Sequence, residues 1–522
     1  MSEKRQVTAA ASVLAVATLL SRCAGLIRDV VVATLFGAGF ATDAFFVAFT
    51  IPNLLRRFFA EGSLTAAFVP IFSQIHHEEG HAQAVYVARQ CWTLLIVVMA
   101  TVTAAGILLA PVLVHLVGQG FETVPGKMAL TIELTRLMFP YIFFVSLLAF
   151  MTGILNVYGH FFIPALSPLV LNLCMIGAAL CLGPCLDIPV GALAWGVLLG
   201  GVSQLAMTWP VVRRYGFQLW PAFHWRHAAV RKIARLMLPG IAGVAIYQIN
   251  VVVTRLLSSF LAQGSVSWLY YSQRLMEFPQ GIFVVSLAQA VLPTMSRHAA
   301  RGDRDGLLES LSHALKLILL VTIPAAAGLV CCAEPLFSLL FMRGAFEFSD
   351  VQQTATALVA YAPGLVFVGI SRVVVPVFHA RQNTRTPVWI SFWTLLINAG
   401  LGLLLMRYWA HTGLAWALTL SSLFNAVLLL WQLRRQLGPL RLSSIFSLLV
   451  KILAATALMT LFVQWMLQGG DWRSGLTPLN LIFLLAAVAG GVGLYGLVCF
   501  LLGIDEIRSL SQWVNRKLHR SG

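Results

Sequence analysis

Charge is the scarcest property of this 522-residue chain, because only 10% of its residues are Asp, Glu, Lys or Arg and only 19 are acidic. Soluble domains carry about 25% charged residues. So few charges cannot cover a surface exposed to water, and the mean hydropathy of +0.85 also excludes an ordinary soluble protein. Apolar runs of roughly 20 residues recur instead, each long enough to cross a bilayer core. The sequence therefore predicts an all-α polytopic membrane protein.

A nucleic-acid interface is also missing, despite a formal net charge of +16. Such an interface needs a basic stripe interleaved with aromatic side chains on a water-exposed surface. No segment outside the apolar runs has that pattern. The positive charge must therefore be explained by its position relative to the membrane.

Metal-ligand spacing is absent from the eight cysteines, most of which lie in apolar runs. Cys181 and Cys185 flank a Gly-Pro turn at a helix end that the predicted topology places outside the cytoplasm. A disulfide and two unpaired thiols both remain open there. The segment His77-Glu78-Glu79-Gly80-His81 matches the H-E-x-x-H zinc-protease pattern. Gly80 weakens the helix that must hold both histidines on one face, so we expect a solvated loop, no metal site and no catalytic residue.

Fourteen apolar stretches are long enough to be membrane helices. They cover residues 7–35, 43–72, 90–117, 129–156, 162–182, 190–212, 233–258, 267–295, 314–342, 351–378, 387–406, 412–433, 445–467 and 479–503. Lysine and arginine favour cytoplasmic loops. If the N-terminus is cytoplasmic, only Lys127, Arg343, Arg407 and Arg473 fall in loops on the far side. One miscounted helix would destroy this asymmetry, so both termini are predicted to be cytoplasmic.

Two stretches of equal length, 41–70 and 264–293, resemble each other. Each begins at a small-residue turn, has aromatic residues early and charges in the middle, and ends with proline. The second and eighth predicted helices carry them, so an even number of crossings separates them and the repeat is parallel. We therefore expect a six-helix lobe at 1–217, a second at 218–440, and two further helices with a cytoplasmic tail at 441–522.

Eight arginines remain inside or beside the predicted helices after the loops are accounted for. They are Arg22, Arg28, Arg56, Arg57, Arg136, Arg255, Arg274 and Arg372. A central arginine costs roughly 2.5–3.5 kcal/mol on insertion scales, so such residues face a partner, a cavity or water.

Pairing with acids is one explanation for these arginines. Arg22 shares a helix face with Asp29, and the pairs Arg57–Glu61 and Arg274–Glu277 have helical spacing. The other explanation is an anion-binding cavity built on the first, second and eighth helices. Arginine suits phosphate there, because its planar fork binds oxyanions bidentately and stays protonated. Prolines close to Arg56 and Arg274 bend these helices, which is typical of transporters.

Three motifs resemble one known family. The second helix contains DAFFVAF-x-IPNLLRRFFAEG-x-L-x-x-AFVP, the first SRCAGLIRDVVVATLFGAG and the eighth GSVSWLYYSQRLMEFP. These are similar to the MurJ/MviN family, the lipid II flippases of bacterial peptidoglycan synthesis. The resemblance covers essentially the whole chain and implies a transporter of the multidrug/oligosaccharidyl-lipid/polysaccharide exporter superfamily. Alternating access around a V-shaped cavity is implied, with a groove on the last two helices for the polyprenyl tail.

The same resemblance assigns roles to residues that match the motifs. Arg22, Arg28 and Arg274 match cavity arginines thought to engage the pyrophosphate. Other functionally important positions are matched by Asp43, Asn53, Arg56, Ser267 and Glu277. Some relatives bind sodium through an acid in the seventh helix. Here 233–258 contains no acid, so sodium coupling is not expected, and the membrane potential is the expected driving force.

These observations predict a lipid II flippase of the bacterial inner membrane that acts as a monomer, with lipid II and membrane lipids as its partners. Because flipping leaves covalent bonds unchanged, no enzyme activity and no cofactor are expected. A flippase for another polyprenyl-pyrophosphate oligosaccharide and a non-transporting cell-wall scaffold remain as alternatives. A cation antiporter fits less well, because its cavity would need exposed acids rather than arginines.

Overall fold

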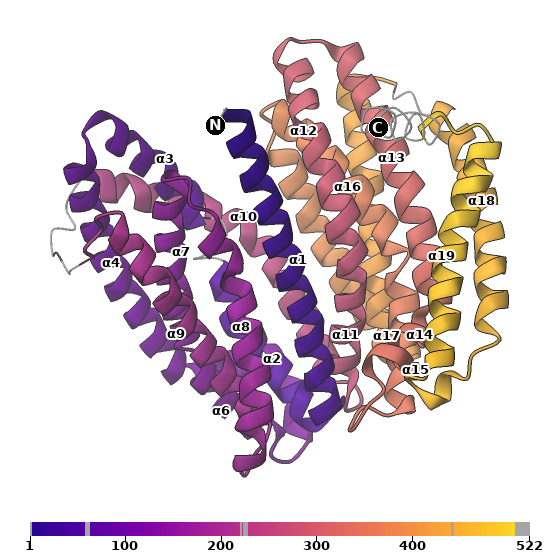
Figure 1. Ribbon diagram of the computed structural model, residues 1–522, viewed down its shortest axis with the longest axis horizontal. Helices are drawn as coiled ribbons and strands as arrows, with labels where there is room; N and C mark the ends of the chain where they lie inside the picture. The colour runs from indigo at the N-terminus through magenta and orange to yellow at the C-terminus, as the bar shows by residue number, and fades with distance from the viewer. Residues whose placement is uncertain (1–2, 58–62, 220–221, 223–227, 440–442, 507–522) are drawn as a thin grey trace. The chain divides into compact units, whose positions relative to one another are not determined.

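The computed structural model describes residues 3–57, 63–219, 222, 228–439 and 443–506, and this part of the chain consists of helices and turns without any strand (Figure 1). The chain divides into two compact units, Met1–Ser267 and Trp268–Gly522. The all-helical fold class predicted from the apolar runs is confirmed.

The first unit is built from the following helices. They are α1 (Glu3–Phe36), α2 (Phe40–Arg56), α3 (Ser63–Glu78), α4 (His81–Leu108), α5 (Ala110–Gly118), α6 (Lys127–Met138), α7 (Tyr141–Val157), α8 (Phe162–Cys181), α9 (Gly191–Arg214), α10 (Ala228–Ser259) and the first turn of α11 (Ser265–Pro279). Helix α8 packs along α1 and against α9, and α10 packs on α3 and α5. Phe68, Trp92 and Phe150 meet in the core between α3, α4 and α7.

The second unit continues from α11 through the remaining helices. They are α12 (Val285–Ala300), α13 (Arg304–Cys331), α14 (Ala333–Phe341), α15 (Phe348–Tyr361), α16 (Gly364–Ala380), α17 (Arg385–Leu437), α18 (Ser443–Leu467) and α19 (Pro478–Leu501). The last two form a hairpin, drawn in yellow in Figure 1, and α18 packs against α13. Met459, Val463 and Leu484 form its buried seam.

Short breaks interrupt several predicted spans in a repeated pattern. In the first unit α4 and α5 break at Leu109, and α6 and α7 break before Tyr141. In the second unit α13 and α14 break at Cys332, and α15 and α16 meet at an angle of 40°. Prolines begin α7 and α16, where a missing N–H costs no helical hydrogen bond. The same two broken spans recur six predicted helices later, which supports the parallel repeat.

All fourteen predicted ranges are mostly helical where the structure describes them. Among the described residues, nine helices are long and apolar enough to cross a membrane, or up to ten if α15 and α16 form one span. Helix α17, with 53 residues, covers two predicted spans and is non-helical at Trp409 and Ala410. The count of fourteen crossings and the lobe boundaries 1–217, 218–440 and 441–522 stay predictions.

Large apolar side chains cover the outside of these helices. Leu108 is 77% exposed, Leu501 71% and Trp465 65%. In water each would be penalised by about 25 cal/mol per Å² of apolar surface. Lipid tails remove that cost, so the exposed apolar surface fits a bilayer as the surrounding medium.

Candidate functional site

The side chain of Arg28, on α1, is buried, and its positive charge is paired with the carboxylate of Asp29 in the first unit. Its Nε and Nη2 donate to Asp29 Oδ1 at 3.0 and 2.7 Å, and its Nη1 donates to Asn172 Oδ1 on α8 at 3.0 Å. The Asn172 amide in turn donates to the carbonyl of Ser21 at 3.3 Å. Only 8% of Arg28 is exposed. The arginine therefore sits in a small polar cluster that crosses from α1 to α8.

The partner of Asp29 differs from the one suggested by helical spacing. Arg22 shares the face of Asp29, but the carboxylate lies 2.7 Å from the neighbouring Arg28. Adjacent residues on a helix usually diverge by about 100°, and the long guanidinium stem spans that angle. Arg22 is partly exposed and lies about two turns before Asp29 on the same helix. Both arginines thus lie on α1, and one of them is held by an internal carboxylate.

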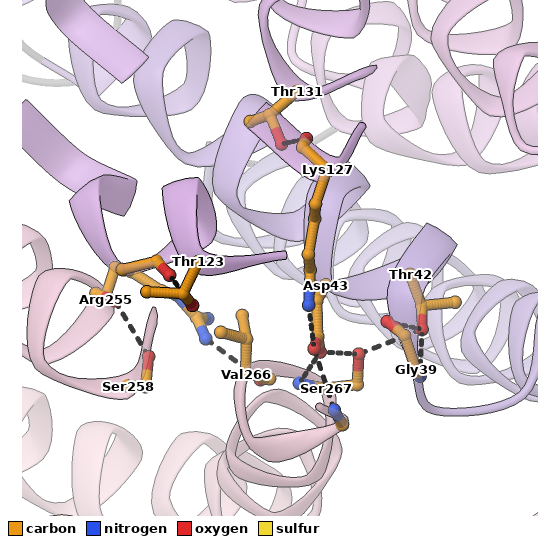
Figure 2. A network of polar contacts seen from close by, with 12 residues as sticks. Gly39, Thr42, Asp43, Thr123, Lys127, Thr131, Arg255, Ser258, Val266 and Ser267 are labelled. Carbon is orange, nitrogen blue, oxygen red and sulfur yellow. Dashed lines mark hydrogen bonds and ion pairs between the residues drawn. The ribbon is translucent and has the colours of Figure 1, made fainter. Parts of the chain in front are cut away.

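Asp43 forms the densest polar network of the first unit (Figure 2). Its carboxylate accepts hydrogen bonds from Lys127 Nζ at 2.9 Å, Gly264 N–H at 2.8 Å, and Ser267 N–H and Oγ–H at 3.0 and 2.7 Å. Four donors satisfy most of the lone pairs of a carboxylate. The predicted site residues Asp43 and Ser267 are therefore in direct contact. Here the carboxylate fixes the first turn of α11 to α2.

Lys127 is the residue of this network that the sequence did not point to. The charge pattern placed it in a far-side loop, whereas the structure buries its side chain to 2% exposure beside Asp43. Its ammonium also lies 4.3 Å from the centre of the Phe121 ring. Lysine is almost never fully buried without a partner. Only its position directly after Gly126, at the start of α6, hinted that it belonged to a helix.

Arg255, one of the eight unexplained arginines, is held by backbone. It is 8% exposed on α10, and its Nη1 donates to the carbonyl of Val266 at 3.2 Å (Figure 2). This contact lies next to Ser267 and the Asp43 network. Arg255 therefore helps to position the first turn of α11.

Asn53 and Arg56 form a local pair on α2. Arg56 Nε donates to Asn53 Oδ1 at 3.0 Å, one turn away, and both side chains are partly exposed. Pro52 lies within the same helix. The suggested partner of Arg57, Glu61, lies outside the described residues.

Arg274 and Glu277 pair on α11 as their spacing predicted. Arg274 Nη1 lies 3.1 Å from Glu277 Oε2, with 33% and 48% of the side chains exposed. Pro279 ends the regular helix, and a π-helical turn follows at Gln280–Val284. Proline leaves a carbonyl without its usual donor, and such π-bulges occur frequently at functional sites. The helical pitch therefore changes directly after Pro279, and the bend expected near Arg274 stays a prediction.

The H-E-x-x-H segment does not form one helical face. Helix α3 ends at Glu78, Gly80 has a φ of +88°, and α4 starts at His81, so His77 and His81 belong to different helices. Burial, and to a smaller extent the charges of nearby histidines, lowers the pKa of His76. Its Nδ1 lies 3.3 Å from the hydroxyl of Tyr158.

Cys181 and Cys185 are exposed free cysteines. Cys185 Sγ instead lies 3.5 Å from the carbonyl of Cys181.

A family model described as lipid II flippase MurJ matches residues 32–483 of the chain. A "Probable lipid II flippase MurJ" of Vibrio cholerae is 36% identical, covering 93% of this chain and 94% of that protein. The lipid II flippase MurJ of Burkholderia cenocepacia is 34% identical, covering 90% and 92%.

Solved structures give the same picture. A lipid II flippase MurJ in an inward closed conformation superposes with a TM-score of 0.78 at 26% identity, covering 95% of this chain and 99% of that one. An inward-facing multidrug transporter of the MATE family, from the MOP superfamily, has a TM-score of 0.67 at 14% identity. It covers 83% of this chain and 99% of its own, and shows a shared fold.

Proposed function

The chain belongs to the MurJ family of lipid II flippases, and from this we propose that it moves lipid II from the cytoplasmic to the periplasmic leaflet of the bacterial inner membrane. The observation that carries the proposal, beyond family membership, is a buried arginine on an apolar helix. Arg28 donates to the side chains of Asp29 and Asn172. Both are side-chain oxygens, which can turn away and be replaced by the oxygens of a substrate.

Arg22, Arg28 and Arg274 are the proposed ligands of the pyrophosphate. Guanidinium groups bind phosphate oxygens in parallel pairs of short hydrogen bonds, and they keep their charge in a low-dielectric site. Arg274 is more accessible than Arg28, because a third of its side chain is exposed. Asn53 and Arg56 on α2 and Glu277 on α11 are proposed to support the head-group site, while Asp43 and Ser267 position it.

Alternating access is the proposed mechanism, with the polyprenyl tail remaining in lipid along α18 and α19. No covalent bond of the substrate changes, so no catalytic residue is assigned. A negative-inside potential would favour outward movement of an anion by about 2.3 kcal/mol per charge per 100 mV. The same potential would return an empty, positively charged site inward. The potential, rather than a sodium gradient, is the proposed driving force, and the protein is proposed to act as a monomer with both termini in the cytoplasm.

Charge removal tests this function in cells. Arg28→Ala and Arg274→Ala should each abolish complementation of a strain depleted of its own flippase while the protein accumulates normally in the membrane. Arg301→Ala, at an exposed position after α12, is the matched control and should complement fully. Full growth with both test variants would refute the role of these arginines and would favour a cell-wall scaffold.

Substrate identity needs a separate measurement. Depletion of the protein should lower the lipid II that is accessible from outside in spheroplasts, and the wild-type chain should restore it. If the outer-leaflet pool is unchanged, lipid II is not the substrate. A flippase for another polyprenyl-pyrophosphate oligosaccharide would then be the explanation to pursue.

A further inference from the structure

A groove opens at one end of α17, far along the chain from every residue assigned above. The two halves of α17 run antiparallel, because Asn425 Nδ2 donates to Thr394 Oγ1 at 2.9 Å and Ser421 Oγ donates to Asn398 Oδ1 at 3.4 Å. Beyond these contacts, towards the arginine-bearing ends of both halves, lies a cavity of about 270 Å³. Arg385, Trp389, Ile390, Leu428, Trp431 and Gln432 line it.

The lining of this groove contains an arginine and no acidic residue. Arg385 lines the groove and Arg434 and Arg435 follow it, all three exposed. No Asp or Glu occurs between Asp350 and Asp471. Within the described part of the chain, the side chains of Arg385 and Arg434 form no ion pair or hydrogen bond. The groove therefore carries positive charge, as a site for an anion does, and its lining has no carboxylate that would occupy the site.

Two tryptophans give the groove an apolar wall. Trp389 is 61% exposed and Trp431 47% exposed. The guanidinium carbon of Arg435 lies 3.9 Å from the centre of the Trp431 ring, so the charge is held over the aromatic wall. Exposed tryptophans at a helix end are typical of the membrane–water interface, and adjacent arginines on the cytoplasmic side are typical of sites for anionic lipid head groups.

We propose that this groove binds one anionic phospholipid. The phosphate would bind Arg385 in the groove, and Arg435, whose guanidinium lies over the lining residue Trp431, would supply a second donor. The part of an acyl chain next to the glycerol would pack on Trp389, Ile390 and Leu428 along the outside of α17. The volume lies just below the range of about 300–1,000 Å³ for ligand pockets, which suits a phosphoglycerol head group rather than a bulky sugar–peptide. The site is thus separate in chemistry and in sequence from the proposed lipid II arginines.

Native mass spectrometry of the full chain in detergent tests the proposal with phosphatidylglycerol as the probe and phosphatidylcholine as the zwitterionic comparison. Wild-type protein should retain phosphatidylglycerol preferentially. Arg385→Gln and Arg435→Gln should each weaken it about tenfold, the loss expected for one charge-assisted hydrogen-bonded contact. Arg407→Gln, near the other end of the same helical hairpin, is the matched control and should change the affinity less than twofold.

Several outcomes would overturn the proposal. Equal loss with Arg407→Gln would mean nonspecific attraction to charge, and unchanged binding in both groove variants would mean that the lipid binds elsewhere. Displacement by inorganic phosphate at equal concentration would show a site for free phosphate. Because Arg385 is exposed and unpaired within the described residues, its variant should keep the wild-type melting temperature, so lost binding reports on the groove rather than on folding.

Discussion

The buried pair of Asp43 and Lys127 offers a sharp test of how this fold holds its charges. Lys127→Met removes the ammonium while keeping an unbranched apolar stem of similar length. The carboxylate of Asp43, 1% exposed, would remain buried with one of its four donors gone. Its bonds to Gly264 and Ser267 would persist.

The expected cost follows from the separation of the two charges. At 2.9 Å and an effective dielectric of about 20, their attraction is about 6 kcal/mol. Desolvation of the ammonium offsets part of this, and the remaining donors to Asp43 stabilise its charge. Removal of one partner of a buried pair typically costs 3–5 kcal/mol. Because three donors remain, we expect about 3 kcal/mol for Lys127→Met, at the lower end of this range.

Equilibrium unfolding in mixed micelles, followed by loss of helical circular dichroism, measures this cost. Asp43→Asn should destabilise by a similar amount, and the double variant should lose at least 1 kcal/mol less than the sum of the two, as expected for coupled neighbours. Lys232→Met, at an exposed position on α10, is the control and should stay within about 0.5 kcal/mol of wild type. A Lys127→Met variant as stable as this control would refute the reasoning, because the ammonium would then contribute nothing to the Asp43 network.

Two further predictions concern the second unit. Gly413→Ala should lower the melting temperature clearly, because a β-carbon there would clash with the carbonyl oxygen of Leu405 across the break in α17; Gly400→Ala, with open space at its β-carbon, should leave stability unchanged or raised. The pKa of Asp303 is lowered chiefly by the N–H of Gly306, which it caps at the start of α13. This stabilisation is present above the ordinary carboxyl pKa and lost as pH falls towards the lowered value. Asp303→Ala should therefore reduce the melting temperature at pH 7, and the difference from wild type should shrink as the pH falls below the ordinary carboxyl pKa of about 4 towards the lowered value; a constant difference at all pH values would contradict this.

Helical class and approximate spans were predictable because hydropathy and the lysine and arginine distribution depend on transfer to lipid, which acts on each segment locally. The broken spans were not. Prolines lie at or just after each of these breaks, but others, such as Pro168 and Pro210, lie inside continuous helices. A proline alone therefore does not predict a break. The pair Arg274–Glu277 was predictable because it lies within one turn of one helix.

Contacts between residues far apart in the sequence are the part of the candidate site that could not be predicted. Asn172 lies on α8, and nothing in its local sequence relates it to Arg28. The sequence placed Lys127 in a loop. A lysine that follows a glycine looks the same in the sequence whether its side chain is exposed to water or buried. Asp43 and Ser267 were both singled out by family resemblance, but only the structure shows that they touch.

The ion pair between Asp29 and Arg28 affects which anions can bind to the arginine. An incoming anion would have to replace a covalently tethered carboxylate, whose local concentration is far above that of any small ion in solution. Chloride or a single phosphate would offer too few contacts to win this exchange. A ligand held by many other contacts, such as a sugar–peptide carrier confined to the membrane, can displace Asp29 from Arg28. Asp29 would thus occupy the arginine until a large substrate, held by many other contacts, displaces it.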